Sequence, residues 1–107
     1  MAKDIEKADY YDIYGELLTE KQREIMEMYY FSDLSLGEIS EETGSTRQAA
    51  FGCIKRCEDR FAELEKALGL LEKKRRAEEL LIGLEAALKN GDSAGCEELI
   101  GELRKIY

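Results

Sequence analysis

The sequence contains no proline and no valine, and both absences bear on the fold class. Proline breaks helices, whereas β-branched valine is enriched in strands. Leucine, glutamate, alanine and lysine, all good helix formers, are abundant instead. A chain of 107 residues is long enough for one domain, or for one small domain with a helical extension. We therefore predict an all-α protein.

Histidine is absent as well, which leaves few means for catalysis or metal binding. It is the commonest general base, and structural zinc sites usually combine four Cys or His ligands. Cys53 and Cys57 lie one helical turn apart and could share a metal ion, but no histidine completes such a site. Without histidine no serine can be activated by a Ser–His pair, and no phosphate-binding loop is present either. We expect no enzyme, no cofactor and no metal, with Cys57 acting as a small apolar side chain.

Long apolar runs are also missing, which bears on the cellular location. No run approaches the roughly 20 residues that a transmembrane helix needs. The segment Met1–Asp4 carries charge with no apolar stretch behind it, unlike a secretory signal. The three cysteines, of which Cys96 is the third, are an odd number without the spacing of a disulfide framework. We predict a cytoplasmic protein that does not enter a membrane.

The net charge of −8 argues against a general nucleic-acid binder, but the charge is unevenly distributed. Residues 1–44 carry 4 basic and 12 acidic side chains, residues 45–76 carry 9 and 5, and residues 77–107 carry 3 and 7. Only the middle segment is basic, which favours a local contact with an anionic partner. Its run Lys73–Arg76 is interpreted as a solvated helix face, with a grip on a phosphate backbone or an RNA as the alternative.

Recurring start and stop signals divide the first part of the chain into short helices. The pairs Thr19–Gln22 and Ser35–Glu38 have the three-residue spacing of a capping box. Gly44 fits the left-handed position that ends a helix, and Ser45 or Thr46 caps the next one. The expected helices are 4–17, 20–31 and 36–43, followed by a long helix. The residues expected on their apolar faces are Tyr10, Ile13, Tyr14, Leu17, Ile25, Met28, Tyr29, Leu36 and Ile39.

Apolar residues in the second part of the chain alternate at spacings of four and three, which predicts a heptad seam. The seam consists of Ala50, Ile54, Cys57, Phe61, Leu64, Leu68 and Leu71. After Gly69 the pattern resumes in two amphipathic helices, the second of which is capped by Asp92 or Ser93. The apolar residues of these two helices are Leu81, Leu84, Leu88, Cys96, Leu99, Ile100, Leu103 and Ile106. Such a seam must be buried against something. We expect residues 69–107 to pack on the N-terminal bundle, residues 1–68, or to form a homodimer.

The segment from about residue 35 to residue 56 has the pattern of a helix-turn-helix. A supporting helix is followed by a turn built on Gly44 and by a long recognition helix. The first residues of a recognition helix contact base edges in the major groove. Arginine can pair with guanine and glutamine with adenine, while basic residues further along suit phosphates. The predicted DNA-binding residues are Thr46, Arg47, Gln48, Phe51, Lys55 and Arg56.

Several motifs together resemble known helix-turn-helix proteins. Three of them are similar to region 4 of bacterial sigma factors: Leu18–Arg23, Tyr29–Tyr30 and Leu34–Ile39. A longer series resembles the YlxM family, small helical proteins of Gram-positive bacteria encoded beside signal recognition particle genes: Tyr14–Gly15, Ser45–Ala49 and Ile54–Arg56. The resemblance covers about residues 8–76.

This resemblance implies an all-α helix-turn-helix bundle, similar to sigma-factor region 4, with a long recognition helix and a C-terminal helical extension. It also implies a DNA-binding regulator of transcription that acts in or on the signal recognition particle pathway, with Arg47, Gln48, Lys55 and Arg56 facing the groove. The alternative is an interaction module that contacts a protein or RNA component of that pathway. The acidic surface outside residues 45–76 favours this alternative, because long-range repulsion weakens DNA binding at low salt.

Overall fold

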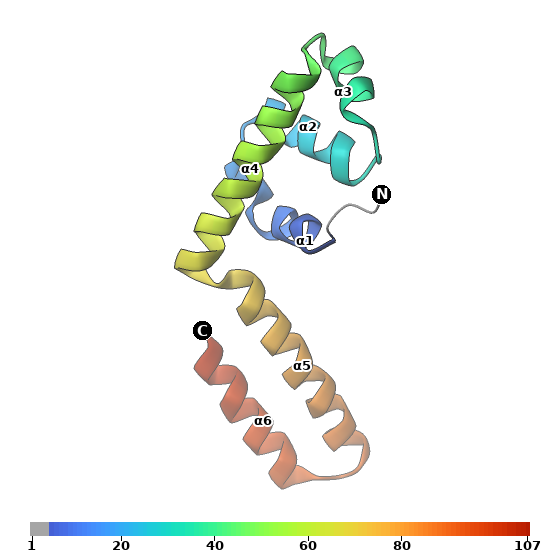
Figure 1. Ribbon diagram of the computed structural model, residues 1–107. Helices are drawn as coiled ribbons and strands as arrows, with labels where there is room; N and C mark the ends of the chain where they lie inside the picture. The colour runs from blue at the N-terminus through green and yellow to red at the C-terminus, as the bar shows by residue number, and fades with distance from the viewer. Residues whose placement is uncertain (1–4) are drawn as a thin grey trace. The chain divides into compact units, whose positions relative to one another are not determined.

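The computed structural model describes residues 5–107 and confirms the all-α prediction. Within this range it contains six α-helices, one short 3-10 turn and no strand (Figure 1). The helices form two compact units, one that ends at Leu68 and one that begins at Gly69. Asp4, the expected start of the first helix, lies outside the described residues.

The first unit contains four α-helices and one 3-10 turn: α1 (Ile5–Tyr14), η1 (Gly15–Leu17), α2 (Glu20–Tyr30), α3 (Leu36–Thr43) and α4 (Arg47–Leu68). Both predicted capping boxes are confirmed. The Thr19 hydroxyl accepts the Gln22 backbone N–H, and the Gln22 side chain accepts the Thr19 N–H. Ser35 and Glu38 make the same reciprocal pair. These bonds satisfy backbone donors that a helix start leaves open, and they fix where α2 and α3 begin.

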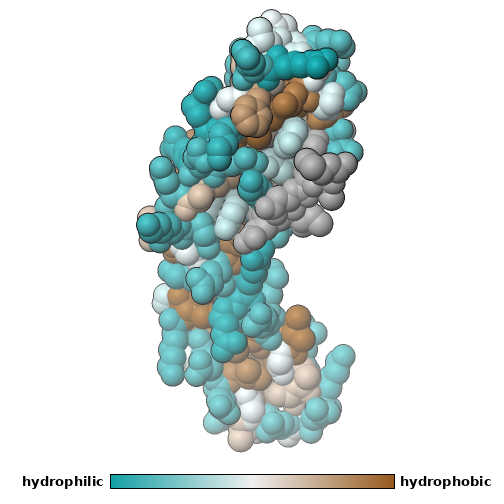
Figure 2. Space-filling view, viewed as in Figure 1, coloured by the Kyte–Doolittle hydropathy of each residue, from teal (hydrophilic) through white to brown (hydrophobic). Residues whose placement is uncertain are grey.

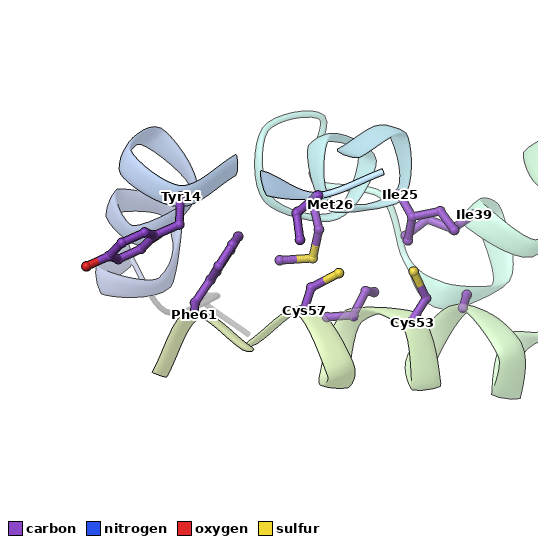
Figure 3. Close-up of a cluster of buried hydrophobic side chains, with 10 residues drawn as sticks. Tyr14, Ile25, Met26, Ile39, Cys53, Cys57 and Phe61 are labelled. Atoms are coloured by element: carbon purple, nitrogen blue, oxygen red, sulfur yellow. The ribbon is translucent and has the colours of Figure 1, made fainter. Parts of the chain in front are cut away.

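The core of the first unit lies between α4 and the helices that precede it (Figure 3). Phe61 of α4 has no exposed surface, and neither have Met26 of α2 and Ile39 of α3. Tyr14 packs on Phe61 with ring centroids 6.3 Å apart and donates a 2.6 Å hydrogen bond to Glu65. One face of α4 therefore supplies the apolar surface on which the other three helices pack.

The apolar face predicted for the first helix is wrong at Leu17, and the face predicted for the second helix packs on the core at Met28 but omits Met26. Leu17 is exposed and Leu18 is buried instead, because η1 winds more tightly than an α-helix and the chain is extended at Leu18. Met28 is half-buried, whereas Met26 is fully buried and points towards Cys57 of α4 (Figure 3). Since α2 contacts both α3 and α4, spacing within α2 alone does not fix the direction of its buried face.

The predicted heptad seam does not continue along one helix. Its first members, from Ala50 to Phe61, are buried inside the first unit, where they contact α1, α2 and α3. The helix then ends at Leu68, and Gly69 adopts the left-handed conformation with φ 61°. This conformation interrupts an α-helix, and glycine adopts it without steric cost. The seam is thus divided at Gly69, and its first part covers the core of its own unit.

The second unit is a hairpin of α5 (Leu70–Lys89) and α6 (Ser93–Ile106). Asp92, one of the two predicted caps, accepts the Gly95 backbone N–H at 2.9 Å. The two helices approach closely at Gly83, where a Cβ atom would lie 3.5 Å from the methyl groups of Leu99. No helix in residues 5–107 is both long and apolar enough to span a bilayer.

The buried side of α5 differs from the predicted one. Leu80 and Ala87 are buried, whereas Leu81 and Leu88 are exposed. No residue of α6 is buried. A pair of helices offers only one contact line, so each helix can hide a narrow part of its apolar surface against the other. The rest of that surface stays open in the hairpin.

The burial of the cysteines leads to a testable difference in reactivity. Cys53 and Cys57 are buried, and burial raises the pKa of the Cys57 thiol to about 12. Because the thiolate is the reactive form, both thiols should react only when the unit opens. We expect a Cys96→Ser variant, which removes the partly exposed thiol, to resist a chromogenic disulfide reagent in the native state. In denaturant, the same variant should release two equivalents of the chromophore per chain at once, one for each of its two remaining thiols. Rapid labelling without denaturant would contradict this packing.

Candidate nucleic-acid interface

A hydrogen-bonded turn joins α3 to α4. Gly44 has φ 70° and ψ 16°, the left-handed conformation that the sequence predicts for this position. The Thr43 hydroxyl donates to the Ile39 carbonyl at 2.8 Å and lies 2.7 Å from the Ser45 hydroxyl. Thr46, rather than Ser45, caps α4, since its hydroxyl accepts a backbone N–H of the first turn at 3.0 Å. These bonds fix the direction in which α4 leaves the turn.

The start of α4 has a buried face and an exposed face. Ala50 and Ile54 are buried against the rest of the unit. Gln48, Phe51 and Lys55 are exposed, and their spacing of three and four residues places them in one row along the helix. Phe51 is 56% exposed, which is unusual for so large an apolar side chain. We call these three residues the outer row.

The ammonium group of Lys55 is paired but not enclosed. It lies 3.2 Å from the Asp59 carboxylate, and both side chains are 58% exposed. An exposed pair of this i,i+4 type contributes only about 0.3–0.5 kcal/mol. Lys55 can therefore exchange Asp59 for another anion at little cost.

Arg47 projects from α4 towards α3. A Cβ atom added at Gly37 would come within 2.9 Å of the Arg47 guanidinium, which therefore lies directly over this glycine. Gly37 leaves the space that Arg47 occupies. The guanidinium therefore lies on the surface where α3 and α4 meet. Arg47 as a whole is exposed to solvent.

Arg56 lies on another side of α4, beside the start of α2. Its guanidinium passes over Gly52, where a Cβ atom would be 3.2 Å from one of its nitrogens. Arg56 also borders a depression of about 270 Å³ whose other lining residues include Lys21 of α2 and Ser45 of the turn. Two basic side chains therefore border this depression, whose other lining is largely apolar.

The six predicted residues thus occupy different places around one helix. Gln48, Phe51 and Lys55 form the outer row, while Thr46 caps the helix. Arg47 extends over α3, and Arg56 extends towards α2. Sequence reasoning missed Lys21 and Gly37. The sequence around these two residues does not indicate a role, because Lys21 and Gly37 come close to the basic residues of α4 only when α2 and α3 pack against it.

The structure offers no sign of a metal centre in the part of the chain that it describes. In residues 5–107, no three His, Cys, Asp or Glu side chains are grouped so that they could hold a metal ion. The exposed groups at the start of α4 include basic, amide and aromatic side chains, which are types that bind phosphates and bases.

Comparison with known proteins adds an independent observation. A family model, UPF0122, described as "Putative helix-turn-helix protein, YlxM / p13 like", matches residues 1–99. The chain is similar to a UPF0122 protein of Shouchella clausii, with 42% identity over 97 residues, 90% of this chain and 89% of the relative. A UPF0122 protein of Listeria monocytogenes is 41% identical over 98 residues, with the same coverage of 90% and 89%.

Higher identity is found over a shorter region. A UPF0122 protein of Clostridium kluyveri is 53% identical over 68 residues, 64% of this chain. That match spans 61% of the length of the relative, or about three fifths. The similarity is thus strongest over a stretch about as long as the first unit.

Proposed function

Because the chain belongs to the UPF0122 family of YlxM- and p13-like helix-turn-helix proteins, we propose that it is a non-enzymatic regulator that binds duplex DNA. The observation that carries the proposal is the outer row of Gln48, Phe51 and Lys55, held at the start of α4 by a hydrogen-bonded turn. This end of a recognition helix enters the major groove in helix-turn-helix proteins.

In the proposed complex the exposed side chains have separate tasks. Arg47 and Gln48 contact base edges, because guanidinium and amide groups match the donor and acceptor patterns of guanine and adenine. Phe51 contacts a thymine methyl group, which accounts for its exposure in the free protein. Lys55, Arg56 and Lys21 neutralise phosphates and position the helix.

The test is fluorescence anisotropy with a labelled duplex from upstream of the protein's own operon and a scrambled duplex, at several salt concentrations. Arg47→Ala should weaken binding to the operon duplex by about 1–3 kcal/mol and leave binding to the scrambled duplex almost unchanged. Lys55→Ala should weaken binding to both duplexes equally. It should also reduce the slope of the logarithm of the binding constant against the logarithm of the salt concentration by about 0.9. Lys66→Ala, an exposed lysine in the last turn of α4, is the matched control and should change neither.

Two results would reject the proposal. One is the absence of binding to either duplex at low salt. The other is an equal loss of affinity in Arg47→Ala and Lys66→Ala for every duplex, since the two side chains would then act only through net charge.

The net charge of −8 favours a second candidate, an interaction module of the signal recognition particle pathway. The acidic side chains are concentrated outside residues 45–76 and repel a duplex over long distances. In this case the same exposed residues contact a component of the particle. The same repulsion acts on an RNA, so the charge favours a protein component, with the RNA as the alternative. Adding the signal recognition particle RNA as a third labelled target distinguishes the two functions. Binding to that RNA alone, lost in Arg47→Ala, would favour the second candidate.

A further inference from the structure

The α5–α6 hairpin leaves large apolar side chains exposed on both of its helices. Leu81 and Leu88 of α5 are exposed, and so are Ile100 of α6 and Tyr107 directly after it. Apolar patches lie over the part of Figure 2 that corresponds to α5 and α6 in Figure 1. Exposed apolar patches on a folded unit commonly mark a surface that another molecule covers.

These side chains share one face of the hairpin. One side of the α5–α6 contact line is a shallow groove lined by Arg76 and Gly83 of α5 and by Glu98 and Glu102 of α6. Successive residues of a helix are rotated by about 100° around its axis. This rotation places the exposed apolar residues of both helices on the side of the α5–α6 contact line that is opposite the groove. We call this surface the open face: it consists of Leu81, Leu84 and Leu88 from α5 and of Ile100, Leu103 and Tyr107 with α6.

The spacing within the open face is that of a helix–helix interface. Its α5 residues are separated by three and four positions, and so are its α6 residues. This pattern places a narrow apolar seam on each helix, as in bundles whose helices pack nearly parallel or antiparallel. Two such seams side by side fit another pair of helices, and the result is a four-helix bundle.

The charges identify the kind of helix pair that fits. Residues 70–79 and 103–107 lie at one end of the hairpin and carry six basic and three acidic side chains. Residues 80–102, at the loop end, carry one basic and five acidic side chains. The hairpin is therefore basic at one end and acidic at the other. An identical hairpin in the reverse direction places each basic end beside an acidic end.

We infer that the open face binds the open face of a second copy of this chain, with the two hairpins antiparallel, so that two chains form a four-helix bundle. An interface of this type is self-complementary, as a two-fold dimer requires. A nucleic acid or an anionic membrane fits less well, because the acidic half of the hairpin repels both. The inference does not depend on DNA binding, although a dimer would carry two helix-turn-helix units.

The test is sedimentation equilibrium of the full chain over a range of concentrations. The wild type should be a dimer that dissociates on dilution. Leu88→Glu should raise the dissociation constant by about 10- to 100-fold, because the interface loses a buried leucine and gains a carboxylate. Leu88 is 66% exposed in the hairpin, so its replacement should leave the circular dichroism spectrum unchanged.

Ile82→Glu is the matched control for this substitution. Ile82 is 68% exposed on the same helix, but it lies about 120° from Leu88 around α5 and outside the open face. This variant should dimerise like the wild type. A monomeric wild type at all concentrations would overturn the inference, and so would equal weakening by the two variants.

Discussion

Replacing Phe61 by alanine is expected to lower the free energy of unfolding of the first unit by about 3–5 kcal/mol. Phe61 has no exposed surface and packs on Tyr14 within the core. The substitution removes the whole phenyl ring from the core and with it the contact with the Tyr14 ring. Since small domains are stable by only about 5–15 kcal/mol, much of the unit's stability should be lost.

Phe51→Ala provides the control for this prediction. It removes the same side chain from the same helix, but Phe51 is 56% exposed. We expect a change of less than about 0.5 kcal/mol, as for most surface substitutions. Chemical denaturation followed by circular dichroism measures both variants. Similar midpoints for the two would show that Phe61 does not hold the core together.

Raising the pH from about 9 to about 12 is expected to destabilise the first unit. Burial raises the pKa of Cys57 from 9.0 to about 12, with a further contribution from Cys53. Burial and a 2.7 Å hydrogen bond to Glu27 raise the pKa of Tyr11 from 10.0 to about 12. In this pH range the folded state retains protons that the unfolded state releases, so stability falls as the pH rises. The full contribution of these groups is present below pH 9.

Denaturant midpoints measured at several pH values between 9 and 12 test this dependence. Cys57→Ala and Tyr11→Phe should each remove part of the slope, because each removes one of the two groups. The prediction fails if stability is constant over this range, or if both variants retain the full slope of the wild type.

The features that the sequence predicts well are those set by neighbours in the chain. The capping pairs Thr19–Gln22 and Ser35–Glu38 and the left-handed Gly44 depend on residues within one helical turn, and all three are confirmed. The sequence does not decide between Ser45 and Thr46 as the cap, because both hydroxyls have suitable positions. Only the turn geometry, in which Ser45 pairs with Thr43, separates them.

The features that the sequence does not predict depend on how helices meet. Met26 is buried because of the direction from which α4 approaches α2, and the spacing of apolar residues in α2 does not contain that direction. The same is true of the candidate interface. Its residues on α4 are recognisable from the helix-turn-helix pattern, whereas Lys21 joins Arg56 only through the packing of α2 on α4.

The division of α4 into two faces has a consequence for changing its target preference. The residues that hold the core and the residues of the outer row do not overlap, although they alternate along the same two turns. In the proposed complex the base contacts come from positions 47, 48 and 51, which are all exposed, so these three positions can be randomised together in a library while Ala50, Ile54 and Phe61 are kept. Most members of such a library should fold, so selection would act on recognition rather than on folding. Under the proposed function, the first unit is a scaffold whose target preference can be changed at three positions.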